Sequence, residues 1–426
     1  MNYFQRKNGV LHAEDVPLAD IAQAVGTPTY VYSQATIERQ FHAVNDALGE
    51  LPHTLCYAVK ANSNLAILHL MHKLGAGFDI VSLGELRRVQ KACGDPHLRE
   101  QSGQPSIVFS GVGKRDAEIL AALQAGVLCL NVESAGELAQ IEKVAMQADL
   151  RAQVSLRVNP DVDPRTHKYI ATGLRESKFG IDMLEARQLY KNASKSKHLR
   201  VIGVDCHIGS QILEVAPFGD AITKVLELVD DLNIQGIPLQ HIDVGGGLGI
   251  PYRDEQPASP AEWGKIIQDL VSGTGLHVIV EPGRVIVGNA GLLLTQVIGK
   301  KQNGQKQFLI VDAAMNDLVR PALYDAWHRV EAVTELAERP QETVDIVGPV
   351  CESGDFLALD RQLPELHPQE LVAILSAGAY GMAMASNYNS RPRPAEVLVH
   401  GSEFAVVRER ESLEDLWRGE KIEGLA

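Results

Sequence analysis

Eight short runs of strand-forming residues recur through the first two thirds of the chain, each followed by a stretch with helical periodicity. The runs are Leu55–Lys60, Phe78–Val81, Ile107–Ser110, Leu128–Glu133, Val154–Val158, Val201–His207, His241–Gly245 and His277–Glu281. They are almost continuously apolar, which is typical of parallel strands buried on both faces. Eight strand–helix units within about 230 residues match the size of a (β/α)8 TIM barrel. We therefore predict an α/β fold with a barrel over residues 30–290, with a doubly wound sheet as the alternative.

The residues at the ends of these runs favour the barrel over the doubly wound sheet. Polar side chains or glycines stand where the runs stop: Lys60, Ser82, Ser110, Glu133, Asn159, His207, Gly245–Gly247 and Glu281. Barrel enzymes build their sites at the carboxyl ends of the strands. One polar residue at a strand end is ordinary turn chemistry, but eight such ends together predict a site at the barrel mouth.

The pattern changes after residue 290. Six strand-like segments follow with no long helix between them: Leu292–Gly299, Gln307–Asp312, Thr343–Val350, Glu370–Ala377, Glu396–His400 and Phe404–Arg408. This spacing predicts an all-β C-terminal domain, a small barrel or sandwich, over residues 291–426. Residues 1–29 are expected to join it, because Phe4–Val10 is strand-like and Asp15–Gly26 is helical in pattern. The polar segments Gly94–Ser106 and Asp254–Pro260 predict surface loops.

Charge and cysteine content narrow the function classes. The formal charge of −14 argues against nucleic-acid binding, which needs a basic surface to neutralise phosphates. No apolar run approaches the ~20 residues that cross a bilayer, and the N-terminus lacks the apolar core of a signal peptide. The five cysteines include no Cys-x-x-Cys pair, so we expect neither a metal site nor a disulfide framework. A protein of the reducing cytoplasm fits these features best.

Lys60 is the first candidate for chemistry, in Tyr57-Ala58-Val59-Lys60-Ala61-Asn62. A lysine that ends an apolar strand at a barrel mouth is desolvated, which favours its neutral, nucleophilic amine. The alternative is a strand-end lysine that reaches solvent. Gly245-Gly246-Gly247-Leu248-Gly249 follows the seventh strand, where barrels often bind phosphate through backbone N–H groups. A tight turn without a ligand is the alternative for this glycine run.

Two more strand ends and three segments of the β domain carry suitable groups. In Glu281-Pro282-Gly283-Arg284, the carboxylate could hold a protonated ring nitrogen and the arginine a carboxylate. The imidazole of His207 could stack on a planar ring. The β domain adds Arg320 with Tyr324, the turn Cys351-Glu352-Ser353-Gly354-Asp355, and Tyr380 between small residues. Taken singly, each of these motifs is better explained by structure than by function.

Together these motifs resemble the alanine-racemase-like (fold type III) pyridoxal-5′-phosphate (PLP) enzymes, and among them the diaminopimelate decarboxylase family. The resemblance runs from Thr29 to Gly401. Its most specific motifs are Tyr57–Asn62, His167–Gly180, His207–Gln211, Gly245–Gly249, Glu281–Arg284, Arg320–Tyr324, Cys351–Asp355 and Tyr380–Gly381. The fold that it implies, a barrel with a β domain, agrees with the strand pattern.

The resemblance also implies a role for each site residue. Lys60 would carry PLP covalently, with His207 stacked on the ring, Glu281 at the ring nitrogen and Asp79 beside the cofactor. The remaining cofactor-binding residues would be Ser210, Gly245, Gly246, Gly247, Gly283, Arg284 and Tyr380. Substrate would be bound by Arg284, Arg320, Tyr324, Glu352 and Tyr380. Cys351 and Glu352 would reach the site of a second subunit, which implies a homodimer with shared active sites, and Cys351 would serve as a catalytic proton donor.

The activity implied is decarboxylation of meso-2,6-diaminopimelate to L-lysine and CO2, the last step of lysine biosynthesis. The alternative on the same fold is a decarboxylase of ornithine, arginine or carboxynorspermidine. A racemase would place an arginine against the ring nitrogen, so Glu281 argues against it. A non-catalytic PLP-binding relative would usually lack the cysteine turn or the β domain, and this chain has both.

Overall fold

The chain forms two compact units in the computed structural model, which describes residues 4–94, 106–163 and 177–422. The barrel unit comprises Gln40–Pro251 and Glu255–Ile286, and the β unit comprises Met1–Arg39, Tyr252–Asp254 and Val287–Ala426. Domain boundaries at residues 30 and 290 stay a prediction. Most of the predicted Gly94–Ser106 loop and of the His167–Gly180 motif lies outside the described residues.

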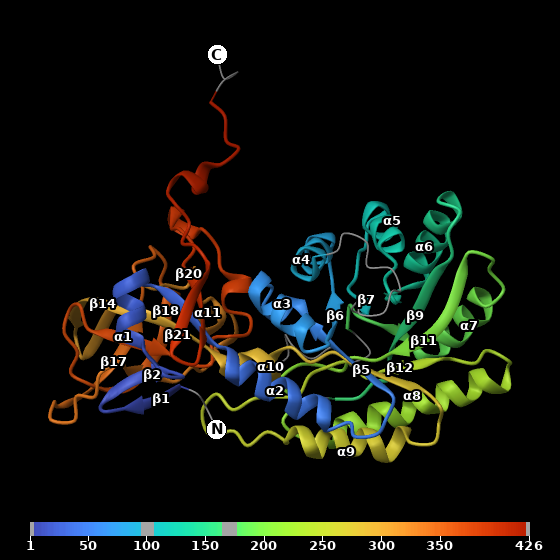
Figure 1. The fold of residues 1–426 in the computed structure, drawn as a ribbon, viewed down its shortest axis with the longest axis horizontal. Helices are drawn as coiled ribbons and strands as arrows, with labels where there is room; N and C mark the ends of the chain where they lie inside the picture. Colours follow the sequence, from blue (N-terminus) through green and yellow to red (C-terminus); the bar gives the residue numbers. More distant parts are fainter. Residues whose placement is uncertain (1–3, 95–105, 164–176, 423–426) are drawn as a thin grey trace. The chain divides into compact units, whose positions relative to one another are not determined.

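Eight parallel strands close into a barrel in the barrel unit (Figure 1). They are β5 (His53–Ala58), β6 (Gly77–Ile80), β7 (Ile107–Phe109), β8 (Cys129–Val132), β9 (Ala152–Asn159), β11 (Leu199–Asp205), β12 (His241–Asp243) and β13 (His277–Val280). Each pairs with the next, β13 pairs with β5, and the short β10 (Ile181–Asp182) adds to β9. Pairing of β8 with β9 closes the ring, so the TIM barrel is confirmed and the doubly wound sheet is excluded.

Helices follow the strands and surround them (Figure 1). The barrel helices are α2 (Gln34–Asp46), α3 (Leu65–Lys73), α4 (Leu83–Cys93), α5 (Asp116–Ala125), α6 (Ala135–Gln147), α7 (Met183–Ala193), α8 (Ala216–Ile234), α9 (Pro260–Val271) and α10 (Arg284–Val287). Several begin with a side-chain cap, such as Ser82 before α4 and Ser134 before α6. These caps satisfy backbone N–H groups directly after strand ends and so fix where each helix starts.

The inside of the barrel is apolar at its centre and acidic towards the carboxyl ends of the strands. An apolar layer is formed by Cys56, Val108, Cys129, Ile202 and Ile279. Beyond it, several strands carry a buried acid near their ends: Asp79 on β6, Asp205 on β11 and Asp243 on β12. The charged groups therefore lie at the mouth of the barrel, where barrel enzymes have their active sites.

The β unit is built on a long mixed sheet. Its strand order is β18-β17-β15-β14-β4-β20-β21, and β19 pairs with β14 and β16. The strands are β4 (Thr29–Ser33), β14 (Gly291–Asn303), β15 (Lys306–Val311), β16 (Val330–Ala332), β17 (Gln341–Val347), β18 (Phe356–Pro364), β19 (Leu371–Ile374), β20 (Ala395–His400) and β21 (Glu403–Arg408). One short helix, α11 (Arg320–Tyr324), follows β15 in the chain.

The N-terminal segment packs on this sheet. It forms a small sheet of β1 (Phe4–Lys7), β2 (Val10–Ala13) and β3 (Val16–Pro17), followed by α1 (Leu18–Val25). Leu18 and Ile21 of α1 share a core with Leu292 and Val397 of the large sheet. Burial of these apolar side chains, rather than helix propensity, holds such a short helix in place.

Each predicted strand of the β unit has a counterpart in the structure, but five further strands were not predicted: β2, β3, β4, β16 and β18. The strand predicted for Phe4–Val10 ends at Lys7, and the helix predicted for Asp15–Gly26 begins at Leu18, after β3. In β18 the buried positions follow no simple alternation, and its register with β17 shifts at Val344 and Ile346. A register shift breaks the period of two that reveals a half-buried strand in a sequence.

Two further expectations concern cysteines and membranes. The five cysteines are free thiols, with Cys56, Cys129 and Cys206 buried and Cys351 exposed. Among the helices of the described residues, none has the length and apolar character that crossing a bilayer would require.

A histidine lies buried where β12 begins. His241 is paired in register with Gly203 of β11, and a Cβ atom on Gly203 would stand 2.0 Å from the His241 Nε2 atom. That nitrogen has no hydrogen-bonding partner among the described residues. Burial, with a smaller contribution from nearby His277, lowers the pKa of His241 to about 4. The native barrel therefore holds this imidazole neutral.

His241 is expected to make the protein less stable in mild acid. Its pKa rises from about 4 in the native state to about 6.5 on unfolding, so below pH 6.5 the unfolded chain binds more protons. This group alone should remove about 3 kcal/mol of unfolding free energy between pH 6.5 and pH 4. Urea unfolding at each pH should show that this part of the loss is missing in His241→Gln. Equal pH dependence in the two proteins would contradict the prediction.

Candidate active site

Lys60 lies at the barrel mouth, where it forms an ion pair with Asp79. The lysine follows β5 in a single 3-10 turn, Val59–Ala61, so the strand ends two residues before the predicted end. The Tyr57 hydroxyl donates to the Asn62 carbonyl at 3.0 Å and braces this turn. The Lys60 side chain is 38% exposed, whereas Asp79 is fully buried. The Lys60 amine is thus fixed by Asp79 and still accessible from the barrel mouth.

His207, after β11, is held by the glycine turn and by Arg157. The Gly246 N–H donates to the His207 Nδ1 atom at 3.2 Å, and Arg157 donates to the His207 carbonyl at 3.3 Å. Because Nδ1 accepts a hydrogen bond, the proton of the neutral ring lies on Nε2. Burial, Arg157 and Lys60 lower the pKa of His207 well below its usual value. The ring is therefore neutral and fixed in one orientation.

The glycine turn after β12 is a close-packed backbone element. A Cβ on Gly246 would lie 2.2 Å from the Glu281 carbonyl oxygen, and one on Gly247 would lie 2.4 Å from the Gly209 carbonyl oxygen. Gly247 also has a φ of 107°, which side-chain-bearing residues rarely adopt. Only glycine fits these positions, and the loops that carry His207 and Glu281 pack directly on them.

Ser210 and Arg284 meet beside this turn. The Arg284 Nε and Nη2 atoms donate to the Ser210 hydroxyl at 3.3 and 3.0 Å. The next residue, Gln211, has a φ of 58° and its side-chain amide pairs with both backbone groups of Ile250. This clamp ties the loop after β11 to the loop after β12, so the serine hydroxyl and the guanidinium keep a fixed separation.

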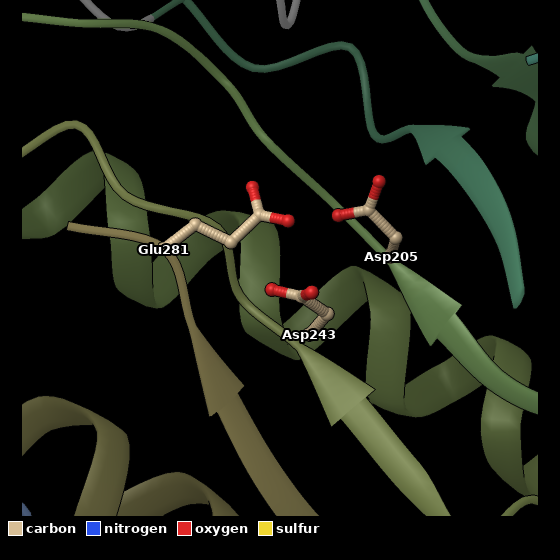
Figure 2. Close-up of side chains that lie close together, drawn as sticks. All are labelled: Asp205, Asp243 and Glu281. Atoms are coloured by element: carbon tan, nitrogen blue, oxygen red, sulfur yellow. The ribbon is translucent and has the colours of Figure 1, made fainter. Parts of the chain in front are cut away.

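Three carboxyl groups gather beneath the mouth: Glu281, Asp243 and Asp205 (Figure 2). One oxygen from each lies within 4.8 Å of the others, and all three side chains are buried. The Asp243 Oδ1 atom accepts the Gly245 N–H at 2.9 Å, and the Arg157 Nε atom lies 3.9 Å from an Asp205 oxygen. Burial and the neighbouring acids, Asp243 first among them, raise the pKa of Glu281 well above its ordinary range.

We call the carboxyl groups of Glu281, Asp243 and Asp205 the acidic floor. A buried lysine, Lys114, is connected to it through a series of hydrogen bonds. Lys114 donates to the Asn131 carbonyl at 2.7 Å and forms an ion pair with Glu137 at 2.7 Å. The Asn131 side chain in turn donates to the Ser110 hydroxyl at 3.0 Å, and Ser110 lies 3.4 Å from a Glu281 oxygen. The chain of contacts from Lys114 to Glu281 consists of rigid, buried groups.

Arg320 of the β unit is held by two uncharged groups. Its Nη1 atom lies 3.1 Å from the His328 Nε2 atom, and its guanidinium lies 4.8 Å from the centre of the Tyr252 ring. His328 is fully buried and its Nδ1 atom lies 2.9 Å from the Leu375 carbonyl oxygen. Since a carbonyl can only accept, Nδ1 carries the proton and Nε2 accepts from Arg320. Tyr324 ends the same short helix, α11.

The cysteine turn is an exposed part of the β unit. Cys351 and Glu352 are exposed, while buried Asp355 accepts the backbone N–H groups of Val350 and Met315, both at 2.7 Å. The Asn389 side chain accepts the Cys351 N–H at 2.7 Å. Tyr380 lies elsewhere in this unit, in the left-handed region with a φ of 56°. A non-glycine residue held in that conformation is often part of a functional site.

The sequence reading missed the acids and the arginine within the strands. Asp205, Asp243 and Arg157 lie inside runs that were identified as strands, where Asp79, implied by the resemblance, was the one candidate not at a strand end. A charged residue inside an almost apolar strand was the available signal, since such groups are rarely buried without a role. His328 and Tyr252 carried no comparable signal, because only the folded β unit brings them to Arg320.

The barrel mouth offers a defined set of chemical groups. Lys60 supplies a primary amine that can add to a carbonyl compound. Ser210, Arg284 and the glycine turn can bind a phosphate, and Glu281 can face a ring nitrogen. These groups suit a ligand that combines a carbonyl, a nitrogen heterocycle and a phosphate.

Comparison with known proteins agrees with this set of groups. Residues 34–288 match the family model described as pyridoxal-dependent decarboxylase, pyridoxal binding domain. A diaminopimelate decarboxylase of Vibrio cholerae is 51% identical over 424 residues, which cover 99% of either chain. Two solved structures are similar over nearly the whole chain, and both are diaminopimelate decarboxylases in complex with L-lysine.

The Helicobacter pylori structure superposes with a TM-score of 0.89 at 43% identity and covers 94% of this chain and 98% of its own. The M. jannaschii structure has a TM-score of 0.91 at 35% identity, with 98% and 97% covered. Likeness at this level extends through both units.

Replacing Lys114 by methionine should destabilise the barrel strongly, because Glu137 would remain buried without its cation. Losing one partner of a buried pair costs about 3–5 kcal/mol, and the added change Glu137→Gln should restore most of it. The control is Lys143→Ala, whose partner Asp116 lies 3.8 Å away at the surface, for which a loss of about 0–1 kcal/mol is expected. Urea unfolding measures all four proteins. Similar losses for the two single variants would contradict the prediction.

Proposed function

Because the chain belongs to the family of pyridoxal-dependent decarboxylases, we propose that it decarboxylates meso-2,6-diaminopimelate to L-lysine and CO2. The observation that carries the proposal is Lys60, held at the barrel mouth against a fully buried Asp79. Chains named diaminopimelate decarboxylase that match over 99% of their length support the substrate.

Pyridoxal phosphate fits the groups at the mouth. Asp79 Oδ1 is buried without a hydrogen-bonding partner among the described residues, so it can accept a hydrogen bond from a ligand beside Lys60. The glycine turn would hold the phosphate with Ser210 and Arg284. Gly283 would also line the cofactor site, and a Cβ atom on it would lie only 2.9 Å from the Ala61 Cβ atom. Tyr380 would also lie near the phosphate. When bound, the cofactor accepts into its ring the electron pair left by the departing CO2.

The chain's own residues orient and balance charge around the ring. Lys60 binds the cofactor through Nζ, and Asp79 keeps that amine in place. His207, fixed by Gly246, offers its flat face for stacking. Glu281 would accept a hydrogen bond from the protonated ring nitrogen. Its burial beside two other acids favours keeping a proton in this region.

Recognition of the substrate's far end is assigned to Arg284, Arg320 and Tyr324, with Glu352 and Tyr380 nearby. Diaminopimelate differs from lysine and ornithine by a second carboxylate, and guanidinium groups bind carboxylates through paired hydrogen bonds. Arg320 fits this role, because its contacts with His328 and Tyr252 hold the buried guanidinium in a fixed orientation.

A homodimer with shared active sites completes the proposal. Cys351 and Glu352 are exposed on a turn that Asp355 holds rigid, which suits residues that reach a second subunit. There the Cys351 Sγ atom would return a proton to the carbon that lost CO2. A cytoplasmic location remains an expectation from the cysteine content.

The activity is tested by measuring CO2 release from meso-diaminopimelate, lysine, ornithine and arginine with PLP-loaded protein. Diaminopimelate should be the preferred substrate and L-lysine the product. A preference for lysine, ornithine or arginine would instead support a polyamine-type decarboxylase on the same fold.

Lys60 should be the residue that binds PLP covalently. Borohydride reduction should trap the cofactor on the Lys60 peptide, and Lys60→Ala should lose both the adduct and the visible absorbance. Lys143→Ala is the control, because the Lys143 side chain is 59% exposed and its loss should leave the barrel intact. The assignment fails if Lys60→Ala retains a reducible adduct on another residue.

Arg320→Ala should impair diaminopimelate turnover. Removing one charged hydrogen-bonding partner costs about 2–5 kcal/mol when the other charge stays buried, so kcat/KM should fall at least ~30-fold. PLP binding should hardly change. The matched control is Arg329→Ala, whose side chain is 65% exposed, and it should leave kcat/KM near the wild-type value. Equal kinetics for wild type and Arg320→Ala would refute this role.

Mixing Lys60→Ala with Cys351→Ala tests the shared sites. Each variant is inactive by itself, but a hybrid dimer would contain one intact site. Random exchange should restore about a quarter of wild-type activity, because half of the dimers are hybrids with one working site of two. Mass spectrometry must show that subunits exchange. No recovery after proven exchange would rule out the cross-subunit role of Cys351.

A further inference from the structure

Asp243 is one of the three carboxyl groups of the acidic floor and lies on β12, the strand between β11, which carries Asp205, and β13, which Glu281 follows (Figure 2). It is fully buried, on β12, and its Oδ1 atom accepts the Gly245 N–H. Its other oxygen, Oδ2, has no N–H or O–H partner among the described residues. The mechanism above assigns Asp243 no part, yet a buried oxygen without a donor is costly unless something supplies a hydrogen bond.

We propose that Asp243 is a positioning residue that stays protonated and donates a hydrogen bond from Oδ2 to the Glu281 carboxylate. The inference rests on the proposed function, because it explains how Glu281 can face a ring nitrogen while surrounded by other acids. Asp243 would thereby join the two cofactor anchors. Its Oδ1 holds the glycine turn through Gly245, and its Oδ2 orients Glu281.

The geometry favours a proton between these groups. One oxygen of Asp243 and one of Glu281 lie within 4.8 Å of each other, and both side chains are buried. Two ionised carboxylates have no hydrogen to share, so one of them must carry it. Close acidic pairs of this kind hold one proton between them, because both cannot ionise at such a separation.

The charges around the floor also favour a retained proton. The groups that face Asp243, Asp205 and Glu281 from the surrounding strands and turns are Asp79, Glu133, Arg157, Lys60, Cys56 and Cys129. Only Arg157 and Lys60 among these are cationic. Arg157 is already paired with Glu133 at 2.8 Å, and Lys60 with Asp79. Acids therefore exceed cations inside the barrel.

Asp243 is the member of the trio best suited to hold the proton. Burial and Asp243 raise the pKa of Asp205 well above its ordinary value, but the Arg157 guanidinium, 3.9 Å away, opposes that rise and favours the charged form. Glu281 would face the positive ring nitrogen, which favours its charged form as well. Asp243 has no cation of its own, and burial raises its pKa to about 7 although the Gly245 amide acts in the opposite direction.

Infrared spectroscopy of the PLP-loaded protein tests the proposal directly. With the aspartate carboxyl carbons labelled with 13C, wild type at neutral pH should show a protonated-carboxyl band that shifts with the label. Asp243→Asn should remove one component of that band, and the isosteric control Asp205→Asn should retain that component. The measurement needs no substrate, so it remains decisive even if diaminopimelate is not decarboxylated.

Cofactor affinity provides a second readout. Asp243→Asn keeps an acceptor for Gly245 and an N–H donor for Glu281, so it mimics the protonated acid. Asp243→Leu lacks both groups. Loss of these buried hydrogen bonds should weaken PLP binding about tenfold or more in the leucine variant, and the asparagine variant should recover most of that loss. If the leucine variant does not fold, the asparagine variant and the infrared band still decide the matter.

Three results would overturn the proposal. The first is a wild-type spectrum without a protonated aspartate band, and the second is a band that Asp243→Asn leaves unchanged in intensity. The third is PLP binding by Asp243→Asn as weak as that of Asp243→Leu, or weaker than that of Asp205→Asn by about tenfold. Each of these outcomes would mean that Asp243 is ionised or that it has no contact with Glu281 that matters.

Discussion

Closure of the parallel barrel is the constraint on which the rest of the site depends. When β8 pairs with β9, the carboxyl ends of eight strands meet around one small opening. Acids that would be solvated at the end of an isolated strand are then buried next to one another. The resulting low-dielectric floor cannot hold all of its negative charge, so it must take up protons or cations.

The other groups at the barrel mouth either compensate the negative charge of the acidic floor or allow the loops around it to pack closely. Lys60 and Arg157 each compensate part of the negative charge, and Lys60 keeps an exposed end. The glycine turn lets the loops of His207 and Glu281 approach within contact distance, which a side chain on Gly246 would prevent. A cationic heterocycle bound here would complete the charge balance, which is why a floor of acids suits a cofactor with a protonated ring nitrogen.

Much of the barrel mouth could be predicted from the sequence, because strand ends in a barrel converge whatever the loops do. The pattern predicted all eight strands and therefore which end residues would meet. Asp243 and Asp205 were missed although each is a charged residue inside an almost apolar strand, because attention went to the residues at the strand ends. The hydrogen bond from Arg320 to His328 depends on loop packing in the β unit, which the sequence does not indicate. Strand β18 could not be recognised, because its register shifts interrupt the alternation of buried and exposed residues.

A crystal structure of the protein with PLP and L-lysine bound would test the central claim most directly. The decisive quantity is the distance from the Glu281 carboxylate to the ring nitrogen of the cofactor. A charge-assisted hydrogen bond of about 2.7–2.9 Å is predicted, with Asp243 in contact with the same carboxylate. A ring nitrogen that faces Arg157 or solvent, with Glu281 turned away from it, would contradict the account.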